Sequence, residues 1–423
     1  MEKERRRQQR KKEGPARKPP TTVNDVPDSL LKLIIDLLKS HVCFIRAAAV
    51  CTRWRRIAST RSITLRDWYR HDFNSCIGHY HVVDPTFSSP PGSQPDRALR
   101  RRVVFVPASP SINARHFSLD FLPKGAGGRP WDLVDGCGSL LLLANTRRGG
   151  YFPELVVCEP ITQRYIQIAP ITDMKYFRCL GVSLYYKYNV ITMSNFTVSC
   201  VLYDQSPGIA DGVSSVTARL YSYKPVTYDA ARRNGWESSR ARTGSRVIHL
   251  GNVESSRYAG RSAGYMFWCV DDDGTVFGCE GRWCSFLQFR VPEHVRGLSC
   301  HQSIMFRSVD DGQYCSRRVL VASLLNGELR VFEQHKDNEG RSNWVLKKSL
   351  DLQEATRGFP GRKDCYFNHT AKIVTAGNGY IVLTPAEETW LFSVELRTMR
   401  VEREHSRNRL PGQTYPYVLG AGR

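Results

Sequence analysis

From residue 102 onward the sequence is a succession of short apolar runs, and this pattern constrains the fold more than any other feature. Clusters of Gly, Pro, Asn and Asp separate the runs, and almost no segment has the period of a long amphipathic helix. Short runs of this kind are typical of β-strands. The expected strands lie at 102–106, 139–144, 154–158, 164–168, 182–193, 197–203, 264–270, 318–324, 328–334, 380–384 and 389–396. This region is therefore predicted to be all-β and too large for a single sandwich.

A weak internal repeat favours a β-propeller for residues 101–423. A strand, a polar turn and a second strand recur at 156–168, 277–289, 329–350 and 390–402. The starts of these segments differ by 121, 52 and 61 residues, so the first interval has room for two units of about 60 residues. Radial repetition of four-stranded sheets accommodates many short strands without long exposed edges. A pair of packed sandwiches is the alternative architecture.

Residues 23–63 have a different pattern, which is typical of a small all-α domain. Apolar residues at helical spacing predict a helix over 27–39, whose polar residues fall on one stripe. A second helical pattern covers 44–58 and ends in a cluster of arginines. Two or three short helices cannot enclose this much apolar surface alone, so the unit is expected to need a partner.

The chain is thus predicted to be α+β, with an all-α domain and a large all-β domain in separate parts. Residues 1–22 are basic and lack apolar periodicity, so we expect a disordered tail. Its clusters of Arg and Lys suit nuclear import or weak nucleic-acid contact, and a solvated tail is the alternative. Residues 64–100 hold Pro85 and a Ser/Pro/Gly run at 88–93, which predict a linker.

Composition narrows the location and the partners. The net charge of +21 favours acidic proteins or nucleic acid as partners. The charged amino terminus has no apolar segment behind it, and no stretch is apolar enough to span a membrane, so we expect the cytoplasm, the nucleus or both, with no membrane contact. The 13 cysteines include no C-x-x-C pair, which argues against a disulfide framework or a zinc module.

No motif for catalysis, a cofactor or a metal stands out. The sequence lacks a nucleophile elbow, a phosphate-binding loop and a zinc-protease helix, so no catalytic residue and no cofactor are predicted. The segment 269–280 nearly matches a calcium loop, with acids at its third and fifth positions and Glu at its twelfth. Its first position is Cys269, however, and its flanks are strand-like. A β-hairpin with an acidic turn is the favoured interpretation.

The helical segment from Val26 to Ala58 resembles the F-box. It opens with Val26-Pro27 and closes with Val50-Cys51-x-x-Trp54-Arg55, with Leu30, Leu31, Ile34, Leu38 and Ile45 at matching offsets. Two positions depart from the pattern: Cys43 replaces an acidic or Ser cap, and Ser40-His41 replaces a common Pro. The resemblance implies docking to a Skp-type adaptor, and through it to a cullin, by Pro27, Leu30, Leu31, Ile34, Val50, Cys51 and Trp54.

The β-rich region resembles the carboxy-terminal F-box-associated domains of plant F-box proteins, especially those of grasses. The segments 135–142, 157–165 and 344–350 carry this resemblance. It implies a non-catalytic, substrate-recognition subunit of a Skp-cullin-F-box ubiquitin ligase, whose β domain recruits a protein substrate. The positive charge favours an acidic substrate.

Two other functions remain open. One is a basic nucleic-acid-binding protein, which would use the tail and the Arg-rich segment 232–261. A solvated loop face is the simpler interpretation of that segment, so nucleic acid is not the expected partner. The other is a propeller enzyme acting on a sugar or an ester, which would need carboxylates and histidines at the mouth of its channel.

Deleting residues 1–22 should leave the melting temperature of the protein unchanged, because a segment without apolar periodicity contributes no core. Thermal unfolding of the truncated and full-length chains checks this. A reporter fused to residues 1–20 tests the import signal separately, and a reporter that stays in the cytoplasm would eliminate it.

Overall fold

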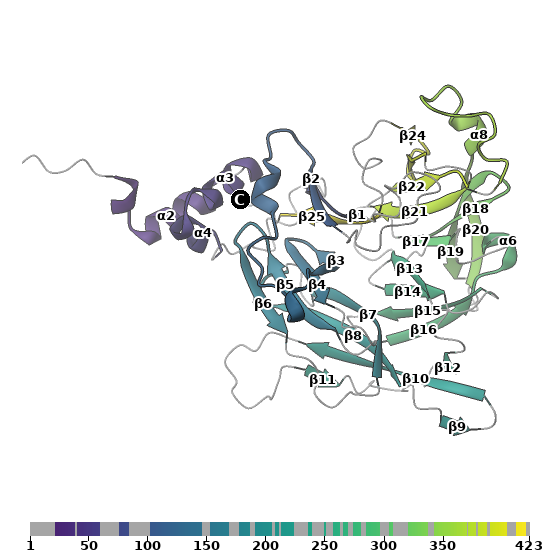
Figure 1. The fold of residues 1–423 in the computed structure, drawn as a ribbon, viewed down its shortest axis with the longest axis horizontal. Helices are drawn as coiled ribbons and strands as arrows, with labels where there is room; N and C mark the ends of the chain where they lie inside the picture. Colours follow the sequence, from purple (N-terminus) through teal and green to yellow (C-terminus); the bar gives the residue numbers. More distant parts are fainter. Residues whose placement is uncertain are drawn as a thin grey trace, which may run out of the picture. The chain divides into compact units, whose positions relative to one another are not determined.

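The structure is a computed structural model of the whole chain. It describes residues 22–38, 40–59, 76–83, 102–145, 153–168, 177–186, 191–204, 208–210, 213–223, 236–238, 249–250, 257–262, 265–269, 274–280, 285–296, 304–307, 320–336, 342–369, 371–377, 380–386, 390–403 and 412–419. The chain divides into two compact units, Met1–Ser62 with Gly422–Arg423, and Ile63–Ala421. Figure 1 shows the helices of the first unit and the strands of the second.

The described part of the first unit is helical. It contains the 3-10 helix η1 (Val23–Asp25) and the α-helices α2 (Asp28–Asp36), α3 (His41–Val50) and α4 (Thr52–Ala58). Helix α4 contacts both α2 and α3. The helix predicted over 44–58 is broken at Cys51, whose φ of −162° and ψ of 174° are extended rather than helical. The interruption turns one predicted helix into the end of α3 and the whole of α4.

The start of this unit differs from the predicted boundary of the tail. The backbone N–H of Thr22 donates to Asp25 Oδ2 at 2.7 Å, and the Thr22 hydroxyl donates to the same atom at 2.9 Å. These bonds hold the first turn of η1. Thr22 therefore belongs to the ordered unit, while residues 1–21 of the predicted tail lie outside the described residues.

Five four-stranded antiparallel meanders account for most of the described strands of the second unit. The first is β3 (Asp132–Cys137), β4 (Leu140–Asn145), β5 (Glu154–Glu159) and β6 (Arg164–Ile168). The second is β7 (Phe177–Tyr186), β8 (Phe196–Asp204), β10 (Val213–Tyr223) and β11 (Trp236–Ser238), with β9 (Gly208–Ala210) and β12 (His249–Leu250) also paired to β10. The third is β13 (Arg257–Ser262), β14 (Tyr265–Cys269), β15 (Thr275–Glu280) and β16 (Ser285–Arg290).

The remaining meanders complete the series along the chain. The fourth is β17 (Ile304–Arg307), β18 (Leu320–Leu325), β19 (Glu328–Lys336) and β20 (Ser342–Asp351), and the fifth is β21 (Lys372–Gly377), β22 (Tyr380–Thr384), β23 (Phe392–Glu395) and β24 (Val401–Glu402). Short helices stand in the connections: η3 (Ala114–Phe117), η4 (Ala126–Gly128), α6 (Glu293–Arg296) and α8 (Leu352–Ala355). Strands β13 and β17 pair in parallel, which joins the third and fourth meanders into one sheet.

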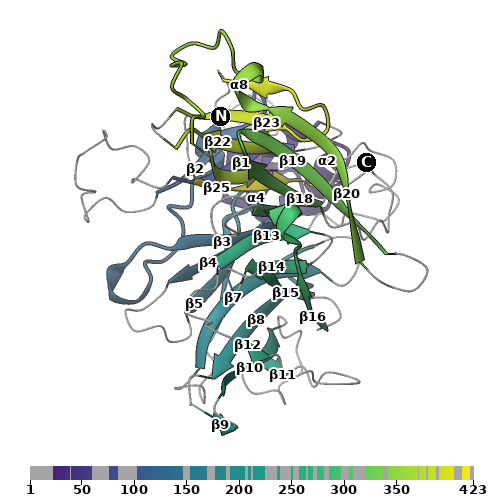
Figure 2. The same ribbon diagram turned by 90° about the vertical axis from the view of Figure 1, so that its right-hand side faces the viewer.

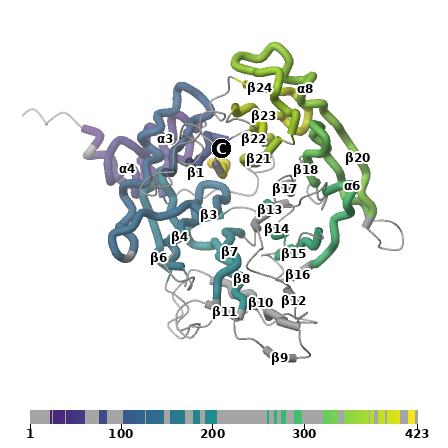
Figure 3. The backbone as a smooth tube through the Cα atoms, turned by 45° about the vertical axis from the view of Figure 1, so that its right-hand side comes forward, coloured from purple at the N-terminus to yellow at the C-terminus, as the bar shows by residue number. Residues whose placement is uncertain are grey.

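A three-stranded sheet brings together the two ends of this unit. Its order is β2 (Arg102–Pro107), β1 (Cys76–Val83) and β25 (Gly412–Val418). Strand β25 pairs with β1 and also contacts β21 and β3, the first strands of the last and first meanders. Figure 3 shows the first strands toward the middle of the unit and the sheets following one another around it, and Figure 2 gives a second view. The arrangement is β-propeller-like, as the sequence predicted.

The internal repeat corresponds to the outer hairpin of a meander. The four repeated segments contain, in order, β5–β6, β15–β16, β19–β20 and β23–β24, which are the third and fourth strands of their sheets. The interval of 121 residues between the first two repeated segments contains the second meander, as expected for an interval with room for two units. The predicted hairpin within 269–280 is also confirmed, because β14 and β15 pair with Cys269 opposite Val276. The acidic residues 271–273 of that turn lie outside the described residues.

The predicted linker over 64–100 is wrong in one part, because it contains β1. This strand is the central strand of the closing sheet, so it is an essential element of the β-rich unit. Apolar and polar residues alternate only weakly along β1, and Gly78, His79 and His81 interrupt its apolar residues. The sequence therefore indicates a strand here only weakly. Glycine is required at 78, where a Cβ would lie 2.4 Å from the Val106 carbonyl oxygen.

The cores lie between successive sheets. One cluster of buried side chains combines Leu142 and Val157 from the first meander with Leu184 and Phe196 from the second. Another combines residues of the fourth and fifth meanders, with Trp390 and Phe392 among its aromatic members. Side-chain packing between neighbouring sheets, in addition to the hydrogen bonds within each sheet, therefore stabilises the ring.

Asp135 makes the polar link between the first two sheets. It is buried on β3, where its Oδ2 accepts a hydrogen bond at 2.7 Å from the backbone N–H of Leu184 on β7. Its Oδ1 accepts a second bond, at 2.8 Å, from the N–H of Gly136. Removing a buried carboxylate that accepts hydrogen bonds from two backbone N–H groups lowers the free energy of unfolding, because both donors then lose their acceptor.

Replacing Asp135 by Ala should lower the free energy of unfolding of the β-rich unit by about 2 to 4 kcal/mol, since the buried N–H of Leu184 would lose its acceptor. Denaturant titration of the full chain measures this. The exposed Asp364 supplies the control, because Asp364→Ala should change the same free energy by less than about 0.5 kcal/mol. Equal effects of the two substitutions would show that the Asp135 link contributes nothing.

Candidate functional site

Helix α2 carries an exposed apolar stripe. Its members are Leu30, Leu33, Ile34 and Leu37, whose exposed fractions are 52%, 54%, 45% and 65%. Their spacing of i, i+3, i+4 and i+7 places them along one face of the helix. A contiguous apolar face of this kind on a described helix is typical of a protein-binding surface.

A different face of α2 supports the fold of the first unit. Leu31 and Ile35 are almost completely buried, with exposed fractions of 1% and 0%. Because they are four residues apart, they lie on one side of the helix, and the exposed stripe lies on another. Helix α2 therefore has two apolar faces, and the fold uses only one of them.

An ion-pair cluster fixes the start of α2 against α4. Arg53 Nε donates to Asp28 Oδ1 at 2.8 Å, and Arg56 pairs with Asp28 Oδ2 at 2.7 Å. Arg53 also donates to the carbonyl oxygen of Val26. The hydrogen bond from Arg53 and the positive charges of both arginines lower the pKa of Asp28 against a weaker opposing effect of desolvation. Asp28 also lies in the first helical turn, where a negative charge favours the helix dipole.

Six of the seven predicted adaptor-binding residues are exposed or half-buried. Leu30 and Ile34 are in the exposed stripe, and Pro27 is exposed at the amino-terminal cap of α2. Val50 and Cys51 are exposed at the junction of α3 and α4, and Trp54 on α4 is half-buried.

Leu31 is the exception among these predicted residues. Its side chain is buried in the core of the first unit, so Leu31 presents almost no surface to a partner. Leu33 and Leu37 complete the exposed stripe and were not predicted as contacts. The periodicity from Leu30 is the signal that identifies them.

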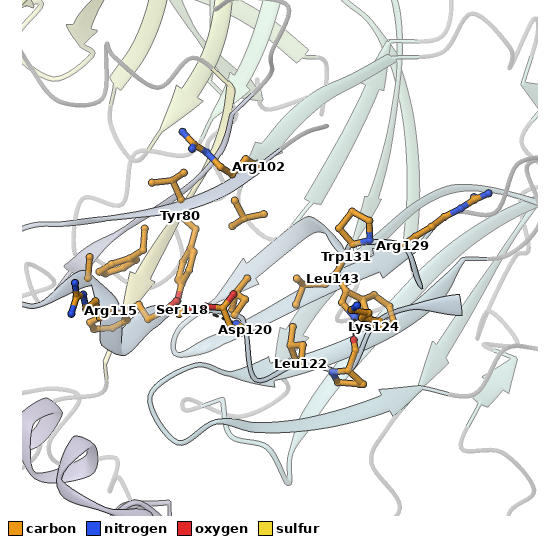
Figure 4. A pocket seen from close by; sticks show the side chains of 18 of the residues that line it. Tyr80, Arg102, Arg115, Ser118, Asp120, Leu122, Lys124, Arg129, Trp131 and Leu143 are labelled. Carbon is orange, nitrogen blue, oxygen red and sulfur yellow. Dashed lines mark hydrogen bonds between the residues drawn. The ribbon is translucent and has the colours of Figure 1, made fainter. Parts of the chain in front are cut away.

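A second candidate site is a pocket of about 960 Å³ in the β-rich unit. Four parts of the chain line it: Tyr80 on β1, strand β2, the segment 114–131 that follows it, and Leu143 on β4 (Figure 4). The apolar part of its lining includes Phe105, Phe117 and Leu143, which are buried. The sequence predicted a strand at 102–106 but no site here, because no local motif connects these four parts of the chain.

Cations surround the apolar part of the pocket. Among the described residues that line it, Arg102, Arg115, Lys124 and Arg129 are exposed cations, and Asp120 supplies the one carboxylate. Asp120 Oδ2 already accepts a hydrogen bond of 2.5 Å from the Ser118 hydroxyl. The pocket therefore has a surplus of positive charge around an apolar base, which favours a ligand with both negative and apolar groups.

Hydrogen bonds and ring stacking hold the lining in place. The Tyr80 hydroxyl donates to the Phe117 carbonyl oxygen at 2.8 Å, and the Phe105 and Phe117 rings stack with centroids 4.0 Å apart. Burial raises the pKa of Tyr80 well above its ordinary value, so the phenol stays protonated and remains a donor. Trp131 Nε1 donates to the Pro123 carbonyl oxygen at 2.6 Å, which orients the indole at the other end of the pocket.

The described residues offer neither a metal-binding cluster nor a membrane-spanning helix. No group of three or more His, Cys, Asp or Glu side chains in the described ranges is arranged to hold a metal ion. None of the helices in that part of the chain combines the length and apolar character needed to cross a membrane.

Comparisons with known proteins add little. No family model and no curated protein matches the chain. Similar solved structures include regucalcin, a calcium-binding protein from Agrobacterium tumefaciens, at 9% identity over 69% of this chain and 76% of that chain, with a TM-score of 0.27. Apo AztD from Citrobacter koseri shares 8% identity over 81% and 98%, with a TM-score of 0.30, and a luciferin-regenerating enzyme shares 10% over 69% and 80%, with a TM-score of 0.27. Such low scores carry no argument, so the fold assignment rests on the strand pairing.

The two faces of α2 should respond differently to truncation. Leu31→Ala should lower the local stability of the first unit by about 2 to 4 kcal/mol, because it leaves a cavity in a packed core. Leu33→Ala, a matched change on the exposed stripe, should alter it by less than about 0.5 kcal/mol. Hydrogen exchange of the α2 and α4 amides reports this local stability, and equal protection in both variants would contradict the division into two faces.

Proposed function

We propose that this chain is a substrate-recognition subunit of a Skp-cullin-F-box type ubiquitin ligase. The first unit would dock a Skp-type adaptor, and through it a cullin, while the β-rich unit would recruit a protein substrate. Catalysis would belong to other subunits, and this chain would hold the substrate near the transferred ubiquitin. The protein would act in the cytoplasm, the nucleus or both.

The exposed stripe on α2 is the observation that carries this proposal. Leu30 and Ile34 are residues that the F-box resemblance assigns to the adaptor, and both are exposed although they are large and apolar. Burying such side chains against a partner contributes roughly 1.5 to 3 kcal/mol each. The β-propeller-like fold of the second unit suits a recruiting role, because its loops and edges present many surfaces on a rigid scaffold.

Nucleic-acid binding is the alternative, and less of the structure supports it. It needs the basic tail and the Arg-rich segment 232–261, but the tail up to residue 21 and most of that segment lie outside the described residues. The net charge of +21 is the observation in its favour. A steep fall of RNA or DNA affinity with salt would support it.

The double variant Leu30→Asp/Ile34→Asp tests the adaptor proposal. Two carboxylates in an apolar contact would be buried without partners, so adaptor binding should weaken about a hundredfold or more. Affinity can be measured by calorimetry with a purified Skp-type adaptor and the full chain. The β-rich unit should keep its melting transition.

A matched control introduces the same charge outside the stripe. Lys32 is exposed on α2 and lies two residues from both Leu30 and Ile34, so it points away from the stripe. Lys32→Glu changes the net charge by the same amount as two added carboxylates and should therefore bind the adaptor as the parent does. A parent that never binds an adaptor, or a stripe variant that binds as tightly as the parent, would refute the proposal and favour the nucleic-acid alternative.

A further inference from the structure

The closing sheet has one strand fewer than the meanders. Each meander has a fourth, outer strand, whereas the order of this sheet ends at its third strand, β2. Among the described residues, β2 pairs only with β1. The outer edge of β2 is therefore in the position where the other sheets carry another strand.

The register shows which backbone groups of β2 point to this edge. The N–H of Ala108 donates to the Ile77 carbonyl oxygen at 2.8 Å, and the register continues through Val106 opposite His79 and Val104 opposite His81. Hydrogen-bonded and non-bonded pairs alternate along an antiparallel ladder. The backbone groups of residues 104 and 106 therefore face β1, and those of 103 and 105 face away from it.

The pocket lies along this edge. Residues 102–105 of β2 line it together with Phe117 and Trp131 of the following segment. An incoming strand would thus meet outward-facing N–H and C=O groups, an apolar base and exposed cations in one place. Of those cations, Arg102, Arg115 and Lys124 form no ion pair with any residue that the structure describes.

We propose that the pocket binds an extended, acidic peptide segment of a partner protein, which adds as a fourth strand to β2. Main-chain hydrogen bonds to residues 103 and 105 would provide register, apolar side chains of the peptide would fill the base, and its carboxylates would face the cations. The charge balance and the edge of β2 that no described strand covers together select this occupant. The proposal deepens the proposed function by naming the substrate class, and it rests on that function for the identification of the peptide as substrate.

Fluorescence anisotropy with the full chain tests peptide binding directly. The probe is a labelled peptide in which Glu and Val alternate, and its two comparison peptides carry Lys for Glu or N-methylated valines that cannot complete a strand ladder. The Glu-Val peptide should bind at least about tenfold more tightly than either. Equal binding of the N-methylated peptide would overturn strand addition, and equal binding of the Lys peptide would overturn the acidic specificity.

Two variants locate the binding site. Arg102→Glu/Lys124→Glu reverses two cations of the pocket and should weaken binding about tenfold. Val103→Pro removes one outward-facing N–H, which a strand edge tolerates, and should weaken binding about fivefold without lowering the melting temperature. Lys372→Glu/Arg397→Glu makes the same charge change at exposed positions outside the pocket and is the control.

The outcomes separate this proposal from its rivals. Unchanged affinity in both pocket variants, or an equal loss in the control, would overturn it. Single-stranded RNA that displaces the peptide and loses affinity in the same pocket variants would assign the pocket to nucleic acid instead. The pocket variants should bind the Skp-type adaptor as the parent does, so a failure here is distinct from a failure of the adaptor proposal.

Discussion

The pairing of β25 with β1 is the contact on which the β-rich unit depends. It joins strands from opposite ends of the unit, with Tyr80 opposite Tyr415. The entropy cost of closing so long a loop grows only slowly with its length, whereas the gain is the removal of exposed strand edges. The Tyr415 hydroxyl donates to the Val134 carbonyl oxygen at 2.8 Å, and the Val418 N–H donates to the Gly138 carbonyl oxygen at 3.0 Å. Strand β25 is thus bonded to the first sheet as well as to β1.

The same closure builds the base of the pocket. Tyr80 on β1 and Tyr417 on β25 have ring centroids 5.7 Å apart, and Phe105 on β2 lies 4.9 Å from Tyr80. Phe117 stacks on Phe105 and meets Tyr417 at 5.4 Å. These four rings come from three paired strands and the segment after β2. A pocket built on such a cluster has a rigid base, which lowers the entropy cost of ordering it around a ligand.

The sequence predicted those strands whose apolar residues form one continuous run. The strands at 140–145 and 380–384 are buried throughout, so their continuous apolar runs identify them. Strand β1 was missed because its His and Gly residues break the pattern, and β25 because it contains Gly412 and Pro416. Both strands form because they pair with each other across the whole unit, and no local window contains that information.

The difference between local sequence pattern and tertiary packing also explains which parts of the two candidate sites could be predicted. Helical spacing predicted α2, but both Leu31 and Leu33 fit an apolar helix, and only packing against α4 decides which of them is buried. The pocket is lined by residues of β1, β2, the segment after β2, and β4, which the tertiary fold brings together. Its cations are ordinary surface residues when read along the chain. They gather around one cavity only because β2, the last described strand of its sheet, lies beside that cavity.

Closure and binding are thermodynamically linked through these shared residues. A ligand that fits only the pocket of the closed ring stabilises that ring by RT ln(1 + [L]/Kd), about 2.7 kcal/mol when the ligand is at a hundred times its Kd. This is a sizeable fraction of the roughly 5 to 15 kcal/mol that separates most domains from their unfolded state. Tyr80 and Phe105 belong to both the closing sheet and the pocket, and opening the β25–β1 pairing would remove the Tyr417 ring that packs on both of them. The pairing that closes the ring is therefore the part of the fold that a bound peptide would reinforce.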